Sequence, residues 1–253
     1  MVRGLARFKD HFQRYEDHYV LIGGTASSLA MEEAGLQFRA TIDLDIVLCV
    51  EALDADFVRT FWDFIRLGNY QNRQKSTGER QFYRFSGPED QSFPEMLELF
   101  SRLPDALAYE GEGHLTPIPM GEEASSLSAI LLDDSYYAFL HAGKQDLDGL
   151  SVLIPEYIIP LKARAWLDLS ARREGGERCL SKHLKKHKLD VFRLFQVISA
   201  DTRIEVPGVV GVDMENFFTK MASESIDLRQ LGYRRGSLLE VLEGLRNIYG
   251  LTK

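Results

Sequence analysis

The sequence predicts an α+β fold: an N-terminal mixed β-sheet domain with flanking helices, residues 1–150, followed by a C-terminal helical domain, residues 151–253. The first observation is a pair of apolar, strand-like runs near the N-terminus, separated by a segment of helical character. Two further strand-like runs, 81–87 and 95–103, are the second. The third is the change to long helical patterns in the second half. A sheet followed by helices is the order expected of an α+β chain.

Size and composition fit one large or two small globular domains. The 253 residues are 45% hydrophobic, and no apolar run reaches the roughly 20 residues that cross a bilayer. The N-terminal segment is polar and lacks a secretory h-region, so we expect a cytoplasmic protein with no membrane partner. The net charge of −8 disfavours overall attraction to nucleic acid or anionic lipid. Cys49 lies in an apolar run and is expected in the core.

The first half of the chain alternates strands and helices. Residues 5–16 predict a short helix, and 18–24 predict a buried strand that ends at a glycine turn. A helix is expected from Thr25 to Ala34, with Gly35 as its C-terminal stop. The elements that follow are expected to be a strand at 41–50, a helix at 54–67 and the strands 81–87 and 95–103.

The middle of the chain has the weakest pattern. Between residues 104 and 152 it predicts only a strand near 127–132 and a short helix at 135–142. The second half is helical. Pro155 and Pro160 each suit the first turn of a helix, where no N–H is needed. Further helices are expected at 181–200, 213–224 and 237–248, after a Glu-Gly-Gly-Glu linker.

Two carboxylates share one face of the strand at 41–50. Side chains alternate along a strand, so Asp43 and Asp45 point the same way, while Leu44 and Ile46 point into the core. Adjacent like charges at the end of a buried strand repel each other and are costly to desolvate. A divalent cation between them makes the arrangement favourable, and Mg²⁺ typically takes one or two carboxylates plus substrate phosphates. The pair therefore predicts a site for one or two Mg²⁺ ions.

The glycine turn that precedes this strand is typical of a phosphate site. Gly23 and Gly24 join a strand to a helix. Glycine lets backbone N–H groups approach a ligand closely, and a helix N-terminus favours anions. Thr25, Ser27 and Ser28 add hydroxyl donors in the first turn. A Gly-Gly turn alone is weak evidence, but the Asp-x-Asp pattern one helix and one strand later makes it much stronger.

Glu98 is a third acidic candidate. It interrupts the apolar strand at 95–103 and shares a face with Met96 and Phe100. On a strand next to the aspartates it would complete a two-metal site or deprotonate an attacking hydroxyl. The other interpretation is an edge-strand glutamate that faces water, and the sequence does not decide between the two.

These motifs resemble the polymerase-β-like nucleotidyltransferases. The family pattern is a hydrophobic residue, Gly, and Gly or Ser, then a helix, then Asp-hydrophobic-Asp-hydrophobic; here Ile-Gly-Gly ends at Gly24 and Asp-Leu-Asp-Ile begins at Asp43. The gap of 43 − 24 = 19 positions is longer than in compact members. It resembles the abortive-infection (AbiEii-type) branch, whose pattern runs Gly-Gly-Thr-Ala, then Arg-x-Thr/Ser-x-Asp-hydrophobic-Asp. Arg39 and Thr41 match that second segment.

The resemblance extends to roughly residue 200 and implies two further site residues. Lys162, in IIPLKARAWLDL, corresponds to a lysine on a helix that would bind nucleotide phosphates. Asp190, in KHKLDVFRLFQ, corresponds to an aspartate on the next long helix that would orient Lys162 or a polar group of the nucleotide. Arg39 would stabilise its loop or contact phosphate. Without the resemblance, Lys162 and Asp190 read as solvated helix residues.

The basic segment 181–190 has a simpler explanation. His183 and His187 are four residues apart and could hold a metal, but the zinc-protease motif is absent. A charged outer face of a helix explains four lysines and two histidines better. The functional alternative is a positive surface for an RNA or another polyanionic acceptor.

Together, the residues and the resemblance predict a Mg²⁺-dependent enzyme that transfers a nucleoside monophosphate from an NTP to an acceptor hydroxyl and releases pyrophosphate. The acceptor implied by the resemblance is a tRNA end or a protein. The implied role is the toxin of a toxin–antitoxin or phage-defence pair, with a cognate antitoxin as partner. Two alternatives stay open: a non-catalytic nucleotide-sensing or partner-binding protein of the same fold, and a small-molecule (antibiotic-type) nucleotidyltransferase.

Overall fold

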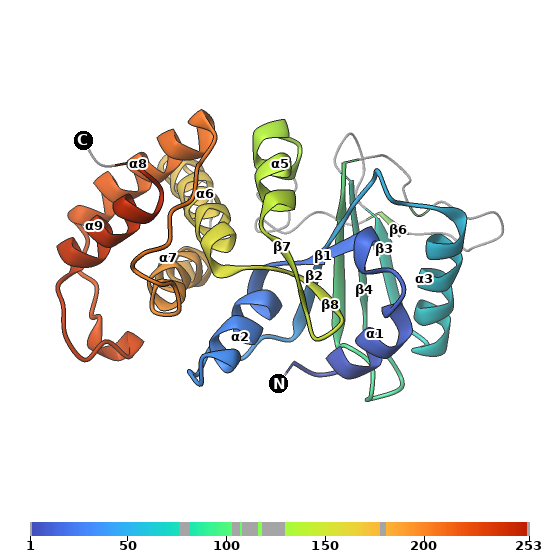
Figure 1. The fold of residues 1–253 in the computed structure, drawn as a ribbon. Coiled ribbons are helices and arrows are strands. Elements are labelled where there is room, and N and C mark those ends of the chain that lie inside the picture. The colour runs from blue at the N-terminus through green and yellow to red at the C-terminus, as the bar shows by residue number, and fades with distance from the viewer. Residues whose placement is uncertain are drawn as a thin grey trace.

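A computed structural model describes residues 2–75, 81–102, 107, 116–117, 130–177 and 181–251. Within these residues, eight strands form one mixed sheet in the order β6-β3-β4-β5-β2-β1-β8-β7, with helices on both faces (Figure 1). The strands are β1 (Tyr19–Leu21), β2 (Asp43–Leu48), β3 (Asn72–Lys75), β4 (Gln81–Ser86), β5 (Met96–Ser101), β6 (Thr116–Pro117), β7 (Lys144–Leu147) and β8 (Leu150–Leu153). The predicted α+β class is confirmed.

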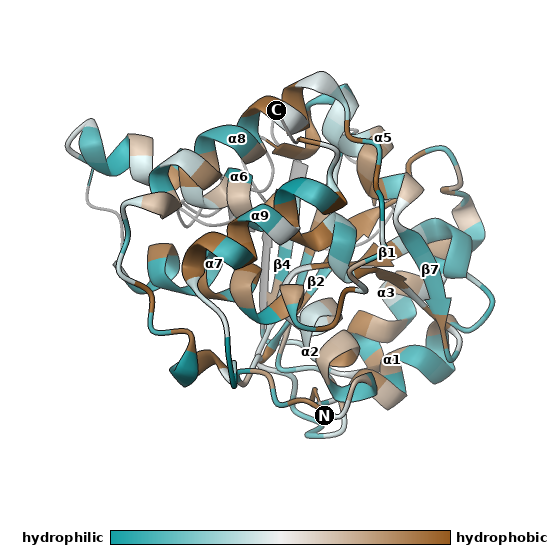
Figure 2. Ribbon diagram, turned by 60° about the vertical axis from the view of Figure 1, so that its left-hand side comes forward, coloured by the Kyte–Doolittle hydropathy of each residue, from teal (hydrophilic) through white to brown (hydrophobic). Residues whose placement is uncertain are grey.

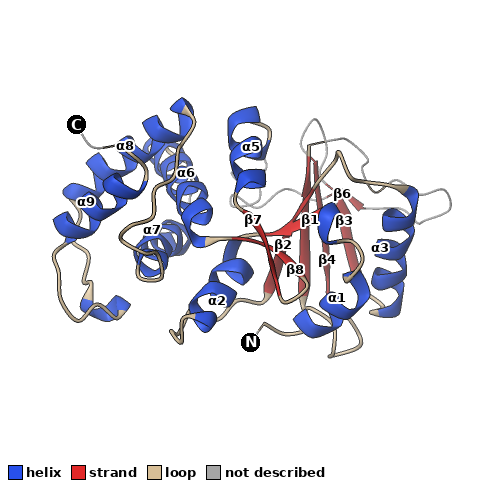
Figure 3. Cartoon of the chain, in the orientation of Figure 1, coloured by secondary structure: helices blue, strands red, loops and turns tan. Residues whose placement is uncertain are grey.

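The helices follow the predicted order closely. They are α1 (Leu5–Phe12), α2 (Gly23–Glu33), α3 (Ala55–Leu67), α5 (Asp134–Ala142), α6 (Pro155–Glu174), α7 (Ser181–Phe195), α8 (Gly208–Ala222) and α9 (Leu238–Ile248), with short 3₁₀ turns η1 (Glu16–His18) and η2 (Arg229–Leu231). Figure 3 shows the strands gathered in one part of the molecule and the last four helices in the other. In the described ranges, every helix is too short or too polar to cross a bilayer.

The alternation along β2 divides the hydrophobic interior into two parts. Leu44 and Ile46 are buried in a core that β2 shares with α1 and α3. Val47 and Cys49 belong to the other core, which contains α2, α5 and the C-terminal helices. The sheet therefore lies between two helical layers, as Figure 1 shows. The aspartates lie on the second side, so they face the layer of α2, α5 and the C-terminal helices.

The C-terminal helices pack as amphipathic elements around α6. Hydrophobic and hydrophilic residues alternate along α7 and α9 in Figure 2, and the buried positions include Val191, Leu194 and Leu245. Helix α6 contacts α7 and α8 most extensively and also reaches α2. The helical layer is thus held against the end of the sheet where β1 turns into α2.

Helix α6 continues through Pro160, where the sequence predicts a new helix. Proline lacks the N–H that would bond to the carbonyl four residues earlier. That carbonyl belongs to Glu156, and it accepts a hydrogen bond from the Tyr249 hydroxyl at 2.7 Å. Tyr249 lies at the end of α9 and is 2% exposed. A side chain from the C-terminus therefore replaces the missing backbone donor, and one helix spans both prolines.

Other expectations are wrong in detail. Residues 130 and 131, expected in a strand, are helical and lead into α5; residues 127–129 lie outside the described residues. Helix α7 ends at Phe195, because the N–H groups of residues 196–198 bond to carbonyls three residues back. Strands β3, β6, β7 and β8 were not predicted. Cys49 is buried in the core, as expected.

Candidate functional site

The two aspartates of β2 lie at the end of the strand, on the side of the helical layer. Asp43 and Asp45 are half-buried, whereas Leu44 between them is fully buried on the other face. Strand β5 runs parallel to β2, and Glu98 is the register partner of Asp45. In-register residues of parallel neighbours point to the same face about 4.8 Å apart at the backbone. The predicted placement of the two aspartates on one face is confirmed.

The glycine turn is packed directly against these carboxylates. Gly23 has a φ of 63°, in the left-handed region, and a Cβ there would overlap Asp45 Oδ2. The Gly24 N–H donates to Asp45 Oδ2 at 3.3 Å. A Cβ on Gly24 would lie 2.6 Å from Thr41 Oγ1. Both glycines are therefore required for the N-terminus of α2 to approach the end of β2.

Two predicted nucleotide contacts are used inside the protein. The Thr25 hydroxyl donates to the Asp43 carbonyl at 2.8 Å, and the Ser27 hydroxyl donates to the Gly23 carbonyl at 2.6 Å. Both side chains are completely buried. Thr25 thus ties α2 to β2 and Ser27 closes the first turn of α2. This geometry favours a structural role for the two hydroxyls over their predicted role as donors to a ligand.

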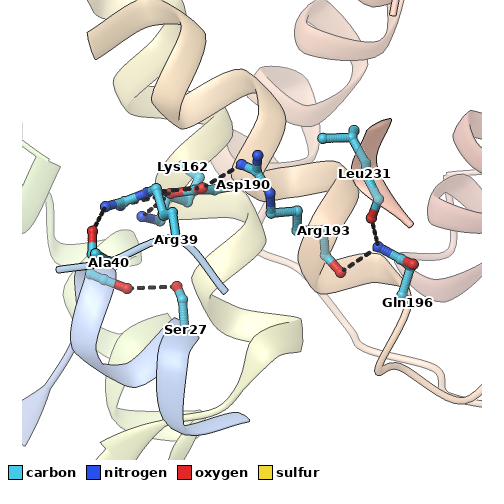
Figure 4. A network of polar contacts seen from close by, with 9 residues as sticks. Ser27, Arg39, Ala40, Lys162, Asp190, Arg193, Gln196 and Leu231 are labelled. Carbon is cyan, nitrogen blue, oxygen red and sulfur yellow. Dashed lines mark hydrogen bonds and ion pairs between the residues drawn. The ribbon is translucent and has the colours of Figure 1, made fainter. Parts of the chain in front are cut away.

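Asp190 is the centre of a polar network that connects three elements (Figure 4). Its carboxylate accepts from Lys162 Nζ of α6 at 3.0 Å. Arg39, from the loop between α2 and β2, donates through Nη2 at 3.0 Å and through Nε at 3.2 Å to each oxygen. Arg193 of α7 adds a bond at 3.3 Å. The predicted contact between Asp190 and Lys162 is confirmed, and Arg39 fastens its loop to the same group.

Asp190 and Lys162 are buried, whereas the Arg39 and Arg193 side chains are 25% and 23% exposed. Burial alone would raise the pKa of Asp190, but the neighbouring Lys162 ammonium and Arg39 guanidinium outweigh it and lower the pKa to about 2. Burial lowers the pKa of Lys162, and the Asp190 carboxylate opposes that shift. Asp190 is therefore ionised at neutral pH and holds Lys162 and Arg39 in fixed positions.

Glu98 has a partner that the sequence did not indicate. Arg84 lies opposite Glu98 on β4, and its Nε and Nη2 approach Glu98 Oε1 at 2.7 and 2.5 Å. The Glu98 side chain is 12% exposed, so it does not simply face water. Neither its predicted place among metal ligands nor a role as base is tested by this contact.

A partly enclosed cavity collects most of the predicted residues. It is lined by Ile22, Gly23, Gly24, Arg39, Thr41, Asp43, Asp45, Glu98, Phe100, Ile158, Leu161, Lys162, Ala165, Lys186 and His187. Thr25, Ser27 and Asp190 are outside this lining. Across the described ranges, no group of three or more His, Cys, Asp and Glu side chains has a metal-holding arrangement. An ion bound by the two aspartates would thus need further oxygen ligands from elsewhere.

Lys186 and His187 are the polar lining residues that sequence reasoning missed. The interpretation of 181–190 as an outer helix face is wrong for His187, which is 6% exposed. Both residues precede Asp190 by four and three positions, and residues at that spacing share a helix face. Since Asp190 is predicted to face the site, its spacing to Lys186 and His187 predicts that these two side chains face the site as well.

A larger cavity lies elsewhere, between α6, α7 and the segment after α8. Its volume is about 770 Å³, and its lining includes Trp166, Lys185, Lys188 and Glu224. None of the residues predicted for the site lines it. The smaller cavity is the better candidate because it alone, among those found in the described residues, combines the carboxylates with the glycine turn.

Comparisons with known proteins give only distant similarities. No family model and no curated protein matches the sequence. The Megavirus polyadenylate synthase matches with a TM-score of 0.39 and 13% identity, over 87% of this chain and 36% of that chain. A nucleotidyltransferase-like protein from Paracoccidioides brasiliensis matches with a TM-score of 0.42 and 13% identity, over 91% of this chain and 85% of that chain. The chain thus spans about a third of the length of the viral enzyme.

Proposed function

We propose that this protein is a Mg²⁺-dependent nucleotidyltransferase, which moves a nucleoside monophosphate from an NTP to an acceptor hydroxyl. The observation that carries the proposal is the cavity itself. Asp43 and Asp45 share it with Gly23 and Gly24 at the N-terminus of α2, and with Lys162 of α6. Carboxylates for a cation, a helix N-terminus and a lysine for phosphate are the groups that such a reaction requires.

The donor set suits Mg²⁺. Asp43 and Asp45 supply carboxylate oxygens on one face of β2, and Mg²⁺ is commonly held by one or two carboxylates, substrate phosphates and water. When bound, the ion neutralises phosphate charge and polarises the phosphorus that is attacked. A second ion would need Glu98 as a ligand, in competition with Arg84.

The chain's own groups position the nucleotide. The N-terminus of α2 presents partial positive charge beside the carboxylates, where a phosphate would lie. Arg39 and Lys162, held by Asp190, add positive charge to the same cavity. Because these groups are fixed before substrate arrives, they stabilise the developing negative charge without reorganising.

The acceptor and the biological role are narrower proposals. The motif resemblance favours a tRNA end or a protein as acceptor, and a toxin that is paired with an antitoxin. One observation favours an alternative: Arg84 engages Glu98, which could leave no third carboxylate for catalysis. In that case the same cavity would bind a nucleotide in a non-catalytic sensor.

The first experiment incubates the purified protein with Mg²⁺ and each α-³²P-labelled NTP, with total tRNA, cell protein or no acceptor. We expect label in one acceptor fraction, and none with Asp43→Asn, because that change removes a charge from the metal site. Asp201→Asn, at an exposed position outside the cavity, is the matched control and should transfer normally. Transfer by Asp43→Asn at the wild-type rate would contradict the metal role. NTP binding without transfer in any fraction would favour the sensor.

A further inference from the structure

The two basic residues predicted to bind phosphate are already committed to a buried carboxylate. Lys162 is 4% exposed and bonds to Asp190, and Arg39 places three hydrogen bonds on the same group. A cation that neutralises a buried aspartate has less charge to offer a ligand. An NTP carries most of its negative charge on the β- and γ-phosphates, so further donors are needed to hold them.

Helix α7 supplies two such donors to the cavity. Lys186 and His187 both line it, together with the aspartates and the glycine turn. Lys186 is half-buried and close enough to Lys162 for its charge to help lower the pKa of that ammonium. His187 is 6% exposed, and in either tautomer an imidazole offers a ring N–H. The position of α7 is fixed by Asp190 one turn further along, which binds Lys162 and Arg39.

We propose that Lys186 and His187 form the subsite for the β- and γ-phosphates of the NTP, and so hold pyrophosphate as it leaves. This inference rests on the proposed function. In the transfer, the acceptor oxygen forms a bond to the α-phosphorus. The bond from that phosphorus to the bridging oxygen breaks, and its electron pair stays on pyrophosphate. The acceptor proton passes to water. Lys186 neutralises the charge that gathers on the leaving group.

The neighbouring lysines of α7 provide the contrast. Lys185 and Lys188 line the larger cavity instead, and Lys188 bonds to Glu224 at 2.7 Å. Replacing Lys185 by Gln removes the same charge from the same helix, one residue away from Lys186. General electrostatic attraction would be weakened equally by the two changes, whereas a subsite would be weakened by only one.

The test is calorimetric binding of each NTP and the matching NMP, with Mg²⁺, to the wild type, Lys186→Gln, His187→Asn and Lys185→Gln. We expect the wild type to bind at least one NTP. For that NTP, Lys186→Gln should bind about 10- to 100-fold more weakly and the NMP should bind unchanged, because a charge-assisted contact is lost only at the terminal phosphates. Lys185→Gln should match the wild type for both ligands. Pyrophosphate, titrated alone, should show the same pattern as the NTP.

The outcomes separate the subsite from the reaction. Equal NTP binding by the wild type and Lys186→Gln would overturn the subsite and leave the transfer reaction untouched. Equal weakening of NTP and NMP would also overturn it, because a general disturbance of the cavity would explain that result. Selectively weaker binding of NTP and pyrophosphate by Lys186→Gln, in a protein that transfers no label, would support the subsite and favour the nucleotide sensor over the transfer reaction. If His187→Asn unfolds, Lys186→Gln, at a half-buried position, still tests whether the phosphate subsite exists.

Discussion

The Asp190 carboxylate is fully buried, and Lys162, itself 5% exposed at the side chain, depends on it for charge compensation. Asp190→Asn keeps the shape but leaves a buried ammonium unpaired, so we expect a loss of roughly 3–5 kcal/mol in the free energy of unfolding. Urea denaturation at pH 7 measures it. Asp201→Asn, at an exposed position, should change stability by less than about 0.5 kcal/mol.

A second change checks this explanation. If the loss comes from the unpaired ammonium, replacing Lys162 by Met in the Asp190→Asn background should restore part of the stability, since Met fills a similar space without charge. A loss below about 1 kcal/mol for Asp190→Asn alone would contradict the prediction. It would mean that burial removes the proton from Lys162 in the native state.

The same carboxylate makes stability depend on pH in the acid range. The pKa of Asp190 is about 2 in the folded protein and about 3.9 in an unfolded chain. A lowered pKa stabilises the fold above the unfolded value, and the contribution is lost as the pH falls through the folded value. The stability gap between wild type and Asp190→Asn should therefore be constant from pH 7 to 5 and narrow by about 2 kcal/mol between pH 5 and 2. A difference in unfolding free energy that grows as the pH falls would refute this role of the Asp190 carboxylate.

At the scale of elements, α6 depends on a donor from the end of α9. Tyr249→Phe removes the hydrogen bond to the Glu156 carbonyl beside Pro160, and we expect a loss of about 1–2 kcal/mol in the free energy of unfolding. In a Pro160→Ala background the helix supplies its own N–H to that carbonyl, so the same tyrosine change should cost less. Urea denaturation of the four proteins forms the cycle. Equal costs in both backgrounds would show that the hydroxyl does not compensate for proline.

The elements differ in how far local sequence determines them. Strand β2 and helix α3 were predicted because their apolar residues repeat at the spacing of a strand and of a helix. The β7–β8 hairpin also has a sequence signal that was overlooked, the pair Asp148-Gly149. Both residues have positive φ, as a two-residue hairpin turn requires. Strand β3, with the polar sequence NRQK, carries none, because its place in the sheet comes from pairing with β4.

The parts of the site that follow from local backbone geometry could be predicted from the sequence. The parts that depend on packing between elements were harder to predict. The alternation of β2 places Asp43 and Asp45 on one face without knowledge of the fold. The spacing of Lys186 and His187 to Asp190 indicates a shared helix face, but whether that face reaches the cavity depends on how α7 packs against α6. The inward bonds of Thr25 and the pairing of Glu98 with Arg84 likewise arise from contacts between elements.

At the scale of the molecule, one hydrophobic core contains both sheet and helical residues. Val20 and Val47 from the strands pack in the same cluster as Phe192 and Leu245 from the helices. We therefore expect a single cooperative unfolding transition. The two tryptophans make this testable, since Trp62 lies in the core beside α1 and Trp166 lies among the C-terminal helices.

The measurement compares urea midpoints from fluorescence of Trp62→Phe and Trp166→Phe, each with far-UV circular dichroism of the same variant as its reference. In each variant the two probes should report the same midpoint. A tryptophan signal that changes well before the circular dichroism signal would show that the parts on either side of residue 150 unfold separately.

The position of β8 has a consequence for how the protein is made. Strand β1 pairs with β2 on one side and with β8 on the other, where Leu21 meets Val152. On the ribosome, β1 therefore emerges long before the strand that covers its second edge. The aspartates and Arg39 are likewise translated well before Lys162, Lys186 and Asp190, so a nascent chain carries the carboxylates of the cavity without the residues that α6 and α7 supply. The order of synthesis itself keeps the site incomplete until α7 has left the ribosome.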